Sequence, residues 1–356
     1  MFEPLNILVF GAGAIGTYVG GSLVLRGNRV TFIEQPKAVE ELRVRGLRLD
    51  LSSNQYSVTS NQYPVCFATS LEEAFQSAPF DFAIYALKSF DTTVVLATLA
   101  PHHSSLPPVI CLSNGVDNEP DLAAVLGEDK VIAGTVTSSV GRRGVGDIAL
   151  ERLRGVGLAD GHPLSLFVWK ALEAASLNPH LFPRPADMKW SKMLTNLPAN
   201  ATAAILNMTA AEVFSHPGLF RLEMQMLREA LAVMKRQGIR VVDLPGTPTR
   251  LLALGIKLPA LLSRPLLAKA VGGGRGGKMP SFHIDLHSGR GRSEVEWLNG
   301  AVVRYGKKTG VPTPVNQMLT ETLMRLTRGE IALAEFNRQP EKLLTLIGRG
   351  YPSGTM

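Results

Sequence analysis

The stretch NILVFGAGAIGTYVGGSLVLRGNRVTFIE, residues 6–34, places three glycines between a short apolar run and a helical pattern. Gly11, Gly13 and Gly16 have the spacing that permits a tight turn, close approach of the backbone to a pyrophosphate, and close packing of a helix on a strand. The helix N-terminus faces the phosphate charge in such a unit. The stretch therefore predicts dinucleotide binding, with the cofactor contacted by Gly11, Ala12, Gly13, Ala14, Ile15 and Gly16.

An acidic residue, Glu34, ends the second predicted strand. A carboxylate at this place accepts hydrogen bonds from the 2′-hydroxyl of an adenine ribose and repels a 2′-phosphate. Glu34 therefore favours NAD over NADP. Arg29, Lys37 and Arg43 are near in sequence and keep a contact to the phosphate of NADP open.

The composition is that of a globular protein, and the length of the chain fits two domains. The chain has 356 residues, of which 45% are hydrophobic, and domains usually contain about 100–200 residues. The formal net charge of +7 is scattered and aromatic residues make up 6%, so nucleic-acid binding is not favoured, and an anionic small molecule explains the charge at least as well. Cys66 and Cys111 are too few and too far apart for a zinc site or a disulfide framework, so no metal is expected.

Neither the start of the chain nor its most apolar segment predicts contact with a membrane. MFEPLNILVF lacks the basic region of a signal peptide. Charged residues and prolines interrupt residues 251–271, which we interpret as amphipathic helix. The glycine-rich residues 271–281 predict a mobile loop. We therefore expect a cytoplasmic protein.

The order of patterns predicts a sheet domain followed by a helical one. Helical patterns separate four apolar runs, residues 6–10, 29–33, 81–87 and 108–113. This alternation predicts an α/β fold with a doubly wound, Rossmann-type parallel sheet covered on both faces. From about Met188 the pattern is mainly helical, most clearly at residues 216–238, where Gly238 ends the helix. We place the dinucleotide-binding domain at residues 1–185 and an all-helical substrate and catalytic domain at 186–356.

Further polar residues stand where chemistry is expected. Lys88 and Asn114 each follow a predicted strand, and ligands of parallel sheets bind beyond the carboxyl ends of the strands. Capping of a loop is the alternative for both residues. Ser293 and Glu294 open a predicted helix that ends at Gly310, and an acid at a helix start more often stabilises the helix dipole than takes part in catalysis.

The stretch WSKMLTNLPAN, residues 190–200, repeats polar residues at intervals of four. Lys192, Asn196 and Asn200 can therefore line one face of a helix, although a plain polar face is the alternative. Pro198 cannot donate a backbone hydrogen bond and is expected to kink the helix.

An ordered set of motifs resembles the ketopantoate reductase (2-dehydropantoate 2-reductase) family: GAGAIG, LKSFDT, LSNGVDNE, WSKMLTN, PSFHIDL and SEVEWLNGAVVRYGKKTGVPTP. The resemblance covers about residues 5–325. It implies a Rossmann domain followed by a helical domain like that of 6-phosphogluconate dehydrogenase, with the active site between them. It also implies reduction of 2-dehydropantoate to (R)-pantoate, a step of pantothenate biosynthesis, by a nicotinamide cofactor that is normally NADPH.

The resemblance assigns roles to residues of this chain. Lys192 matches the catalytic lysine and Glu294 the glutamate beside the catalytic centre. Lysine in that role stabilises the negative charge on the carbonyl oxygen and donates a proton to it. The substrate-binding positions of the family fall on Asn196, Asn200 and Ser281. Its cofactor-side positions fall on Lys88 and Asn114.

The chain departs from the family pattern at three places. Gln35 stands where the family has the arginine that reads the 2′-phosphate, which with Glu34 favours NAD. A further substrate-binding asparagine has only a loose counterpart in Asn207. The segment between Ser281 and Glu294 is one residue longer and contains two histidines and two arginines. These departures bear mainly on the substrate.

Alternatives to ketopantoate reduction therefore remain. One is reduction of a related 2-oxo acid, and another is reduction of an imine, as in opine dehydrogenases. A third is a dinucleotide-binding sensor without turnover. The sequence leaves a homodimer and a monomer open.

Overall fold

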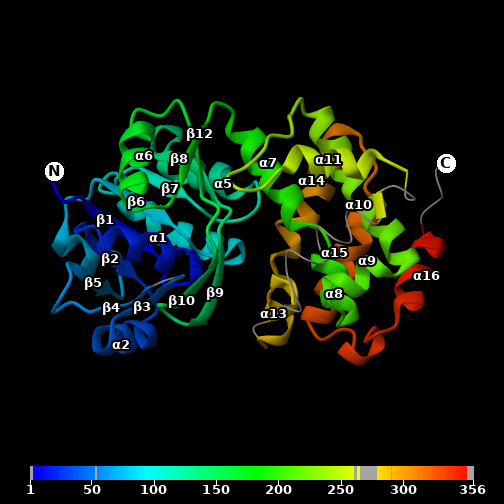
Figure 1. Cartoon of the computed structure of the whole chain (residues 1–356), viewed down its shortest axis with the longest axis horizontal. Coiled ribbons are helices and arrows are strands. Elements are labelled where there is room, and N and C mark those ends of the chain that lie inside the picture. Colours follow the sequence, from blue (N-terminus) through cyan, green and yellow to red (C-terminus); the bar gives the residue numbers. More distant parts are fainter. Residues whose placement is uncertain (1–2, 53, 260–262, 265–278, 290, 351–356) are drawn as a thin grey trace. The chain divides into compact units, whose positions relative to one another are not determined.

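The structure is a computed structural model that describes residues 3–52, 54–259, 263–264, 279–289 and 291–350. The chain forms two compact units, coloured blue to green and green to red in Figure 1. One unit comprises Met1–Lys189 with Leu244–Thr247. The other comprises Trp190–Asp243 with Pro248–Met356.

The first unit is built on an eight-stranded sheet with the order β12-β11-β8-β7-β6-β1-β2-β5. The strands from β8 to β5 are parallel, as predicted, whereas β11 runs antiparallel to β8. Because the parallel strands share one carboxyl edge, the loops that follow them meet there. The strands are β1 (Asn6–Phe10), β2 (Arg29–Ile33), β5 (Val65–Ala68), β6 (Phe82–Tyr85), β7 (Val109–Cys111), β8 (Val131–Val136), β11 (Val156–Ala159) and β12 (Pro179–Phe182).

A second sheet of four strands has the order β4-β3-β10-β9. It packs against α1 (Ala14–Val24), which also contacts the large sheet. Every residue from Gly16 to Val24 is buried, which explains why this helix is apolar on all sides. The strands of the second sheet are β3 (Leu47–Leu51), β4 (Asn54–Val58), β9 (Ser139–Gly144) and β10 (Asp147–Arg152).

The other helices of the first unit connect the strands. They are α2 (Pro36–Arg45), α3 (Leu71–Ala74), α4 (Thr92–Leu99), α5 (Asn118–Leu126) and α6 (Ser165–Ala174). Four 3₁₀ helices add short turns, η1 (Phe75–Ser77), η2 (Ser89–Asp91), η3 (Ala100–His102) and η4 (Glu128–Lys130).

The second unit is built from helices in its described residues (Figure 1). Helix α10 is central, because it packs against α9, α11, α14, α15 and α16. It ends as predicted, with Gly238 at φ +68° two residues beyond its last turn. The helices are α7 (Pro185–Asn196), which begins in the first unit, α8 (Asn200–Leu206), α9 (Ala210–Ser215), α10 (Pro217–Arg236), α11 (Thr249–Lys257), α13 (Ser281–His287), α14 (Asn299–Thr309), α15 (Pro314–Thr327), α16 (Pro340–Gly350), and the 3₁₀ helices η5 (Glu294–Glu296) and η6 (Leu333–Glu335).

The apolar segment at residues 251–271 is described only in part. Helix α11 is amphipathic, with Leu251 and Leu254 exposed and Ile256 buried. Most of the glycine-rich stretch that predicts a loop lies outside the described residues. No helix in the described part of the chain is long and apolar enough to span a membrane.

Candidate functional site

The glycine-rich turn joins β1 to α1 as predicted. Gly11 adopts φ +94°, and a Cβ atom on Gly16 would lie 1.9 Å from the Gly11 carbonyl oxygen, so glycine is required at both. A Cβ atom on Gly13 would meet nothing within 4 Å. The turn therefore presents open space at a helix N-terminus, which fits the pyrophosphate of a dinucleotide.

The peptide groups of Ala12 are fixed from three sides. Its N–H donates to Glu34 Oε2 at 2.8 Å. Its carbonyl oxygen accepts from the Gly146 N–H at 2.8 Å and from Thr17 Oγ1 at 2.9 Å. Gly146 lies in the turn between β9 and β10, so the small sheet supports the dinucleotide turn. Glu34 thus lies beside the turn, where an adenine ribose binds in this fold.

The basic residues considered as contacts to a 2′-phosphate are placed differently. Arg29 begins β2 and Glu34 follows its end, so the two are separated by about 16 Å of extended chain. The Arg43 guanidinium pairs with Glu73 and donates to the Phe67 carbonyl at 2.9 Å. Lys37 is exposed near the start of α2 and remains a candidate.

Lys88 and Asn114 follow neighbouring parallel strands, β6 and β7. The structure brings the two loops together, because Ser89 Oγ donates to the Asn114 carbonyl at 2.9 Å. Since β6 also pairs with β1, both residues lie at the same sheet edge as the glycine-rich turn.

The helix that carries Lys192 and Asn196 ends earlier than predicted. A kinked helix through residue 200 was expected, but α7 ends at Asn196 and α8 starts two residues after Pro198. Ala199 between them is left-handed (φ +54°), and its N–H donates to the buried carboxylate of Glu223 at 2.7 Å. The helix breaks because proline disfavours helical geometry before it and because a distant carboxylate accepts the N–H of the turn.

Asn200 contacts the two other predicted substrate-binding residues, Asn196 and Ser281. Its Nδ2 donates to the Asn196 carbonyl and to Ser281 Oγ, both at 3.2 Å, and its Oδ1 accepts from the Phe282 N–H at 3.1 Å. Ser281 is exposed at the start of α13, whereas Asn200 is buried. Both amide hydrogens of Asn200 are therefore used within the protein, and its amide fixes the start of α13 on α8.

Glu294 is buried at the start of η5. The hydroxyl of Ser293 accepts the Val295 N–H at 3.3 Å and so caps this turn. The prediction of one helix from Ser293 to Gly310 is wrong at its start. The backbone leaves helical geometry at Leu298 (φ −109°, ψ −79°), and α14 begins only after it.

Comparison with known proteins gives the family. Residues 7–160 match the model described as ketopantoate reductase PanE/ApbA, and residues 186–327 match its C-terminal counterpart. The chain belongs to the ketopantoate reductase family. It is therefore an oxidoreductase of this type that uses a nicotinamide dinucleotide.

Relatives of this ketopantoate reductase family member can be aligned with most of its chain. A 2-dehydropantoate 2-reductase of Archaeoglobus fulgidus is 28% identical over 330 residues, 91% of this chain and 97% of the relative. The crystal structure of a PanE/ApbA family ketopantoate reductase from Ralstonia eutropha JMP134 has a TM-score of 0.76 at 24% identity, over 92% and 99% of the chains. A D-mandelate dehydrogenase in complex with NADH and anilino(oxo)acetate has a TM-score of 0.73 at 21% identity, over 91% and 99%.

Asn207, the loose counterpart of a further family asparagine, lies after the end of α8. Its Oδ1 is 2.8 Å from Nε2 of His283, and its Nδ2 donates to Asn337 at 3.2 Å. The side chain therefore contacts α13 and the segment before α16.

Sequence reasoning missed Lys189, one helical turn before Lys192. Its buried ammonium group donates to the Ser113 carbonyl at 2.6 Å and to the Gly134 carbonyl at 3.2 Å. The Ser113 carbonyl lies two residues after the end of β7, and the Gly134 carbonyl belongs to β8. The signal available in the sequence was a lysine three residues from the candidate catalytic one.

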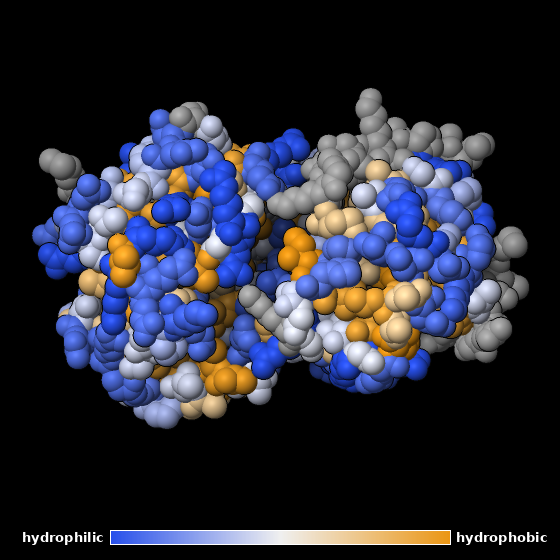
Figure 2. Space-filling model, turned by 90° about the horizontal axis from the view of Figure 1, so that it is seen from below, coloured by the Kyte–Doolittle hydropathy of each residue, from blue (hydrophilic) through white to orange (hydrophobic). Residues whose placement is uncertain are grey.

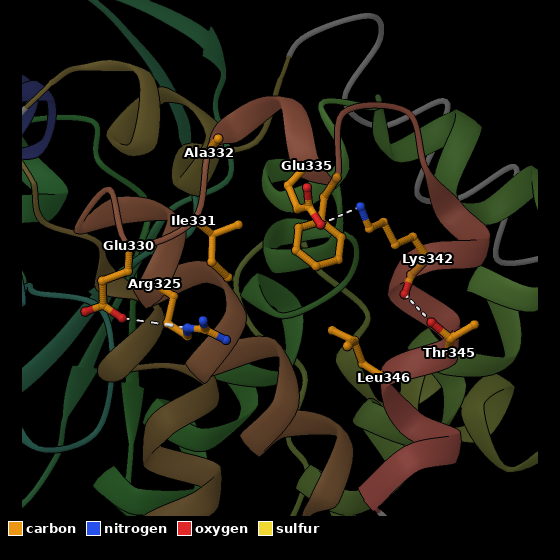
Figure 3. A pocket seen from close by; sticks show the side chains of 9 residues that line it. Arg325, Glu330, Ile331, Ala332, Glu335, Lys342, Thr345 and Leu346 are labelled. Atoms are coloured by element: carbon orange, nitrogen blue, oxygen red, sulfur yellow. Dashed lines mark hydrogen bonds and ion pairs between the residues drawn. The ribbon is translucent and has the colours of Figure 1, made fainter.

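Residues near the C-terminal end of the chain line a pocket (Figure 3). Two ion pairs line it, Arg325 with Glu330 at 3.7 Å and Lys342 with Glu335 at 2.5 Å. Its charges are thus paired within the protein, and it includes none of the predicted site residues.

Proposed function

We propose that the protein reduces a branched 2-oxo acid to the 2-hydroxy acid, with 2-dehydropantoate, reduced to (R)-pantoate, as the first candidate. The observation that carries this proposal is the contact of Asn200 with both Asn196 and Ser281. It joins residues 81 positions apart that the family resemblance assigns to one substrate. Lys192 precedes Asn196 by four residues on α7 and lies on the same face of that helix.

Lys192 is the proposed general acid. When bound, a reduced nicotinamide supplies a hydride to the carbonyl carbon. The electron pair of the C=O bond moves to oxygen, and the Lys192 ammonium group stabilises that charge and transfers a proton to it. Lys192 is half-buried, so it is open to substrate while partly shielded from water.

The neighbouring polar groups have complementary roles in the proposal. Asn196 and the exposed hydroxyl of Ser281 orient the carboxylate and hydroxyl oxygens of the substrate without adding charge. Asn200 holds Ser281 and the start of α13 in place. Glu294 is the proposed carboxylate beside the catalytic centre, as the family resemblance implies.

For the cofactor we propose NADH over NADPH. The Glu34 carboxylate beside the turn repels a 2′-phosphate, and Gln35 supplies no positive charge. The most obvious nearby arginine, Arg43, is paired with Glu73. The D-mandelate dehydrogenase complex supports the proposal in one respect, because it is a protein of similar fold that binds NADH.

A related 2-oxo acid is the second candidate. The observation that favours it is the pair His283 and His287, whose ring centroids lie 4.2 Å apart on the helix that starts with Ser281. The His283 ring also contacts Asn207, the loose counterpart of the further family asparagine, so the substrate-binding pattern of the family is changed here.

A panel of substrates and cofactors tests the proposal. Purified protein is assayed with NADH and NADPH against 2-dehydropantoate, aliphatic and aromatic 2-oxo acids, and the same acids with amines. We expect the highest kcat/KM with 2-dehydropantoate and NADH. Turnover only when an amine is present would support an imine reductase, and NADH binding without turnover of any acid would support a sensor.

We propose a cytoplasmic homodimer that binds neither nucleic acid nor membrane. The surface in Figure 2 is largely hydrophilic with groups of apolar residues on both units. Exposed apolar side chains of the helical unit include Leu251, Leu254 and Ile284. Light scattering after size exclusion gives the mass directly, and a single mass of about 38 kDa at all concentrations would contradict the dimer.

A further inference from the structure

A chain of buried polar side chains lies beneath the loops that carry Lys88 and Asn114. Tyr85, Ser89, Thr92 and Asn118 are each at most 1% exposed. They come from the end of β6, from η2, and from the starts of α4 and α5. None of them is among the residues that the sequence assigned to the site.

The hydrogen bonds of this cluster run in one direction. The Tyr85 hydroxyl donates to Thr92 Oγ1 at 3.1 Å, and Thr92 donates to Asn118 Oδ1 at 2.8 Å. Asn118 Nδ2 then donates to Ser89 Oγ at 3.1 Å and to the Asn114 carbonyl at 2.7 Å. Each hydroxyl donates once, and the two amide hydrogens of Asn118 have separate acceptors.

The protonation of Tyr85 maintains this direction. Burial raises the pKa of its hydroxyl, so the group stays protonated and donates. Because every member of the network has a partner, removal of one member leaves buried groups unsatisfied.

The network fixes both loops at the positions next to the cofactor-side residues. Ser89 also donates to the Asn114 carbonyl at 2.9 Å, and Ser113 Oγ donates to the Leu87 carbonyl at 2.8 Å. The residues on both sides of Lys88 are thus held from the β7 loop. Asn114 is held through its own carbonyl, which accepts two hydrogen bonds.

We infer that Asn118 is a positioning residue for the cofactor, which acts by holding the Lys88 and Asn114 loops in the geometry that binds the dinucleotide. The inference rests on the proposed cofactor role of Lys88 and Asn114. Asn118 is itself buried, so its proposed effect on the cofactor passes through these loops.

The test compares NADH binding by fluorescence titration in full-length variants. Asn118→Leu keeps a similar volume and removes all three hydrogen bonds, and Ser89→Ala removes a smaller part of the network. We expect Asn118→Leu to raise the Kd and the KM for NADH by about tenfold while kcat at saturating NADH changes less than threefold. Thr92→Ser keeps the hydroxyl that donates to Asn118 and should bind NADH nearly as well as the wild type.

Ser165→Ala is the matched control. Ser165 is also buried, and its hydroxyl donates to the Ala159 carbonyl at 2.7 Å, at the opposite edge of the sheet. This variant should bind NADH normally even where its unfolding midpoint falls as far as that of the network variants. If it weakens NADH binding equally, a general loss of stability explains the effect and the inference is wrong.

Lys88→Ala separates the inference from the proposal on which it rests. If Lys88→Ala binds NADH like the wild type, the cofactor role of Lys88 is wrong and the inference falls with it. If Lys88→Ala weakens binding while Asn118→Leu and Ser89→Ala stay within twofold of the wild type, only the positioning role is overturned.

If the cofactor role of Lys88 and the positioning role of Asn118 are both correct, the two changes act on one contact. The double variant Lys88→Ala/Asn118→Leu should then raise the Kd for NADH by less than the product of the two single effects. If Asn118→Leu does not fold, Ser89→Ala decides by the same criterion, with a threefold rise in Kd as the threshold.

Discussion

Lys189 Nζ lies 2.6 Å from Oε1 of Glu119, and the two side chains are only 6% and 14% exposed. This ion pair joins the first half of α7 to α5. Together with the bonds from Lys189 to the Ser113 and Gly134 carbonyls, it ties the helix to the loop after β7 and to the neighbouring strand β8. The candidate catalytic Lys192 follows one turn later on the same helix.

The first prediction concerns this ion pair. Lys189→Met leaves a buried carboxylate without its partner and should lower the free energy of unfolding by about 3–5 kcal/mol, measured by urea denaturation. Lys342→Met is the control, because Lys342 and its partner Glu335 are 45% and 49% exposed, and it should change stability by less than about 1 kcal/mol. The double variant Lys189→Met/Glu119→Leu should recover much of the loss. Equal stability of the wild type and Lys189→Met would show that the pair contributes nothing.

Removal of the proposed general acid should affect turnover and leave cofactor binding intact. Lys192→Ala is expected to lower kcat by about 10²–10⁴ at an unchanged Kd for NADH, because only the transition state needs the proton. Steady-state kinetics and fluorescence titration measure the two effects. Lys170→Ala, which removes an exposed lysine on α6, should retain wild-type kcat. Near-wild-type turnover in Lys192→Ala would exclude the assigned role.

Cofactor preference should depend on the charge of Glu34. We expect the wild type to prefer NADH by at least about tenfold in kcat/KM, equivalent to about 1.4 kcal/mol. Glu34→Gln keeps an oxygen that accepts the Ala12 N–H, so the turn stays supported while the charge that repels a 2′-phosphate is lost. This variant should use NADPH better, at little cost to the KM for NADH. A wild type that prefers NADPH would overturn the cofactor proposal.

Glu212 should titrate far below its ordinary pKa. Its hydrogen bond from the Thr209 N–H, with further contributions from Arg338 and the Thr209 hydroxyl, lowers the pKa from 4.5 to about 2. Because the folded pKa is below the unfolded one, the group stabilises the protein fully above pH 4.5 and loses that contribution as the pH falls towards 2. Carbon-13 NMR of the carboxyl measures this pKa.

Arg338→Ala separates the causes of this shift. The Thr209 N–H remains in the variant and is the larger cause, so the pKa of Glu212 should rise but stay below 4.5. A return to the ordinary value would mean that the ion pair, rather than the helix cap, sets the titration.

Much of the fold was predictable from sequence because its signals are local. The glycine turn, strands β1 and β2, and the end of α10 at Gly238 depend on residues that are neighbours in the chain. Rules based on neighbours failed where a distant group intervened. Pro198 predicted a kink, but the Glu223 carboxylate accepts the Ala199 N–H and stabilises a full break between two helices.

The sequence by itself determined the class of protein and the identity of the candidate residues, since motif spacing and residue type suffice for both. Only the tertiary structure decided which side chains meet. It pairs Asn200 with Ser281, Lys189 with Glu119, and Asn118 with both Ser89 and the Asn114 carbonyl. The physical reason is that buried polar groups must be satisfied wherever the chain brings them together, and in the Asn200–Ser281 pair the partners are 81 residues apart in the chain. No local pattern encodes such pairs.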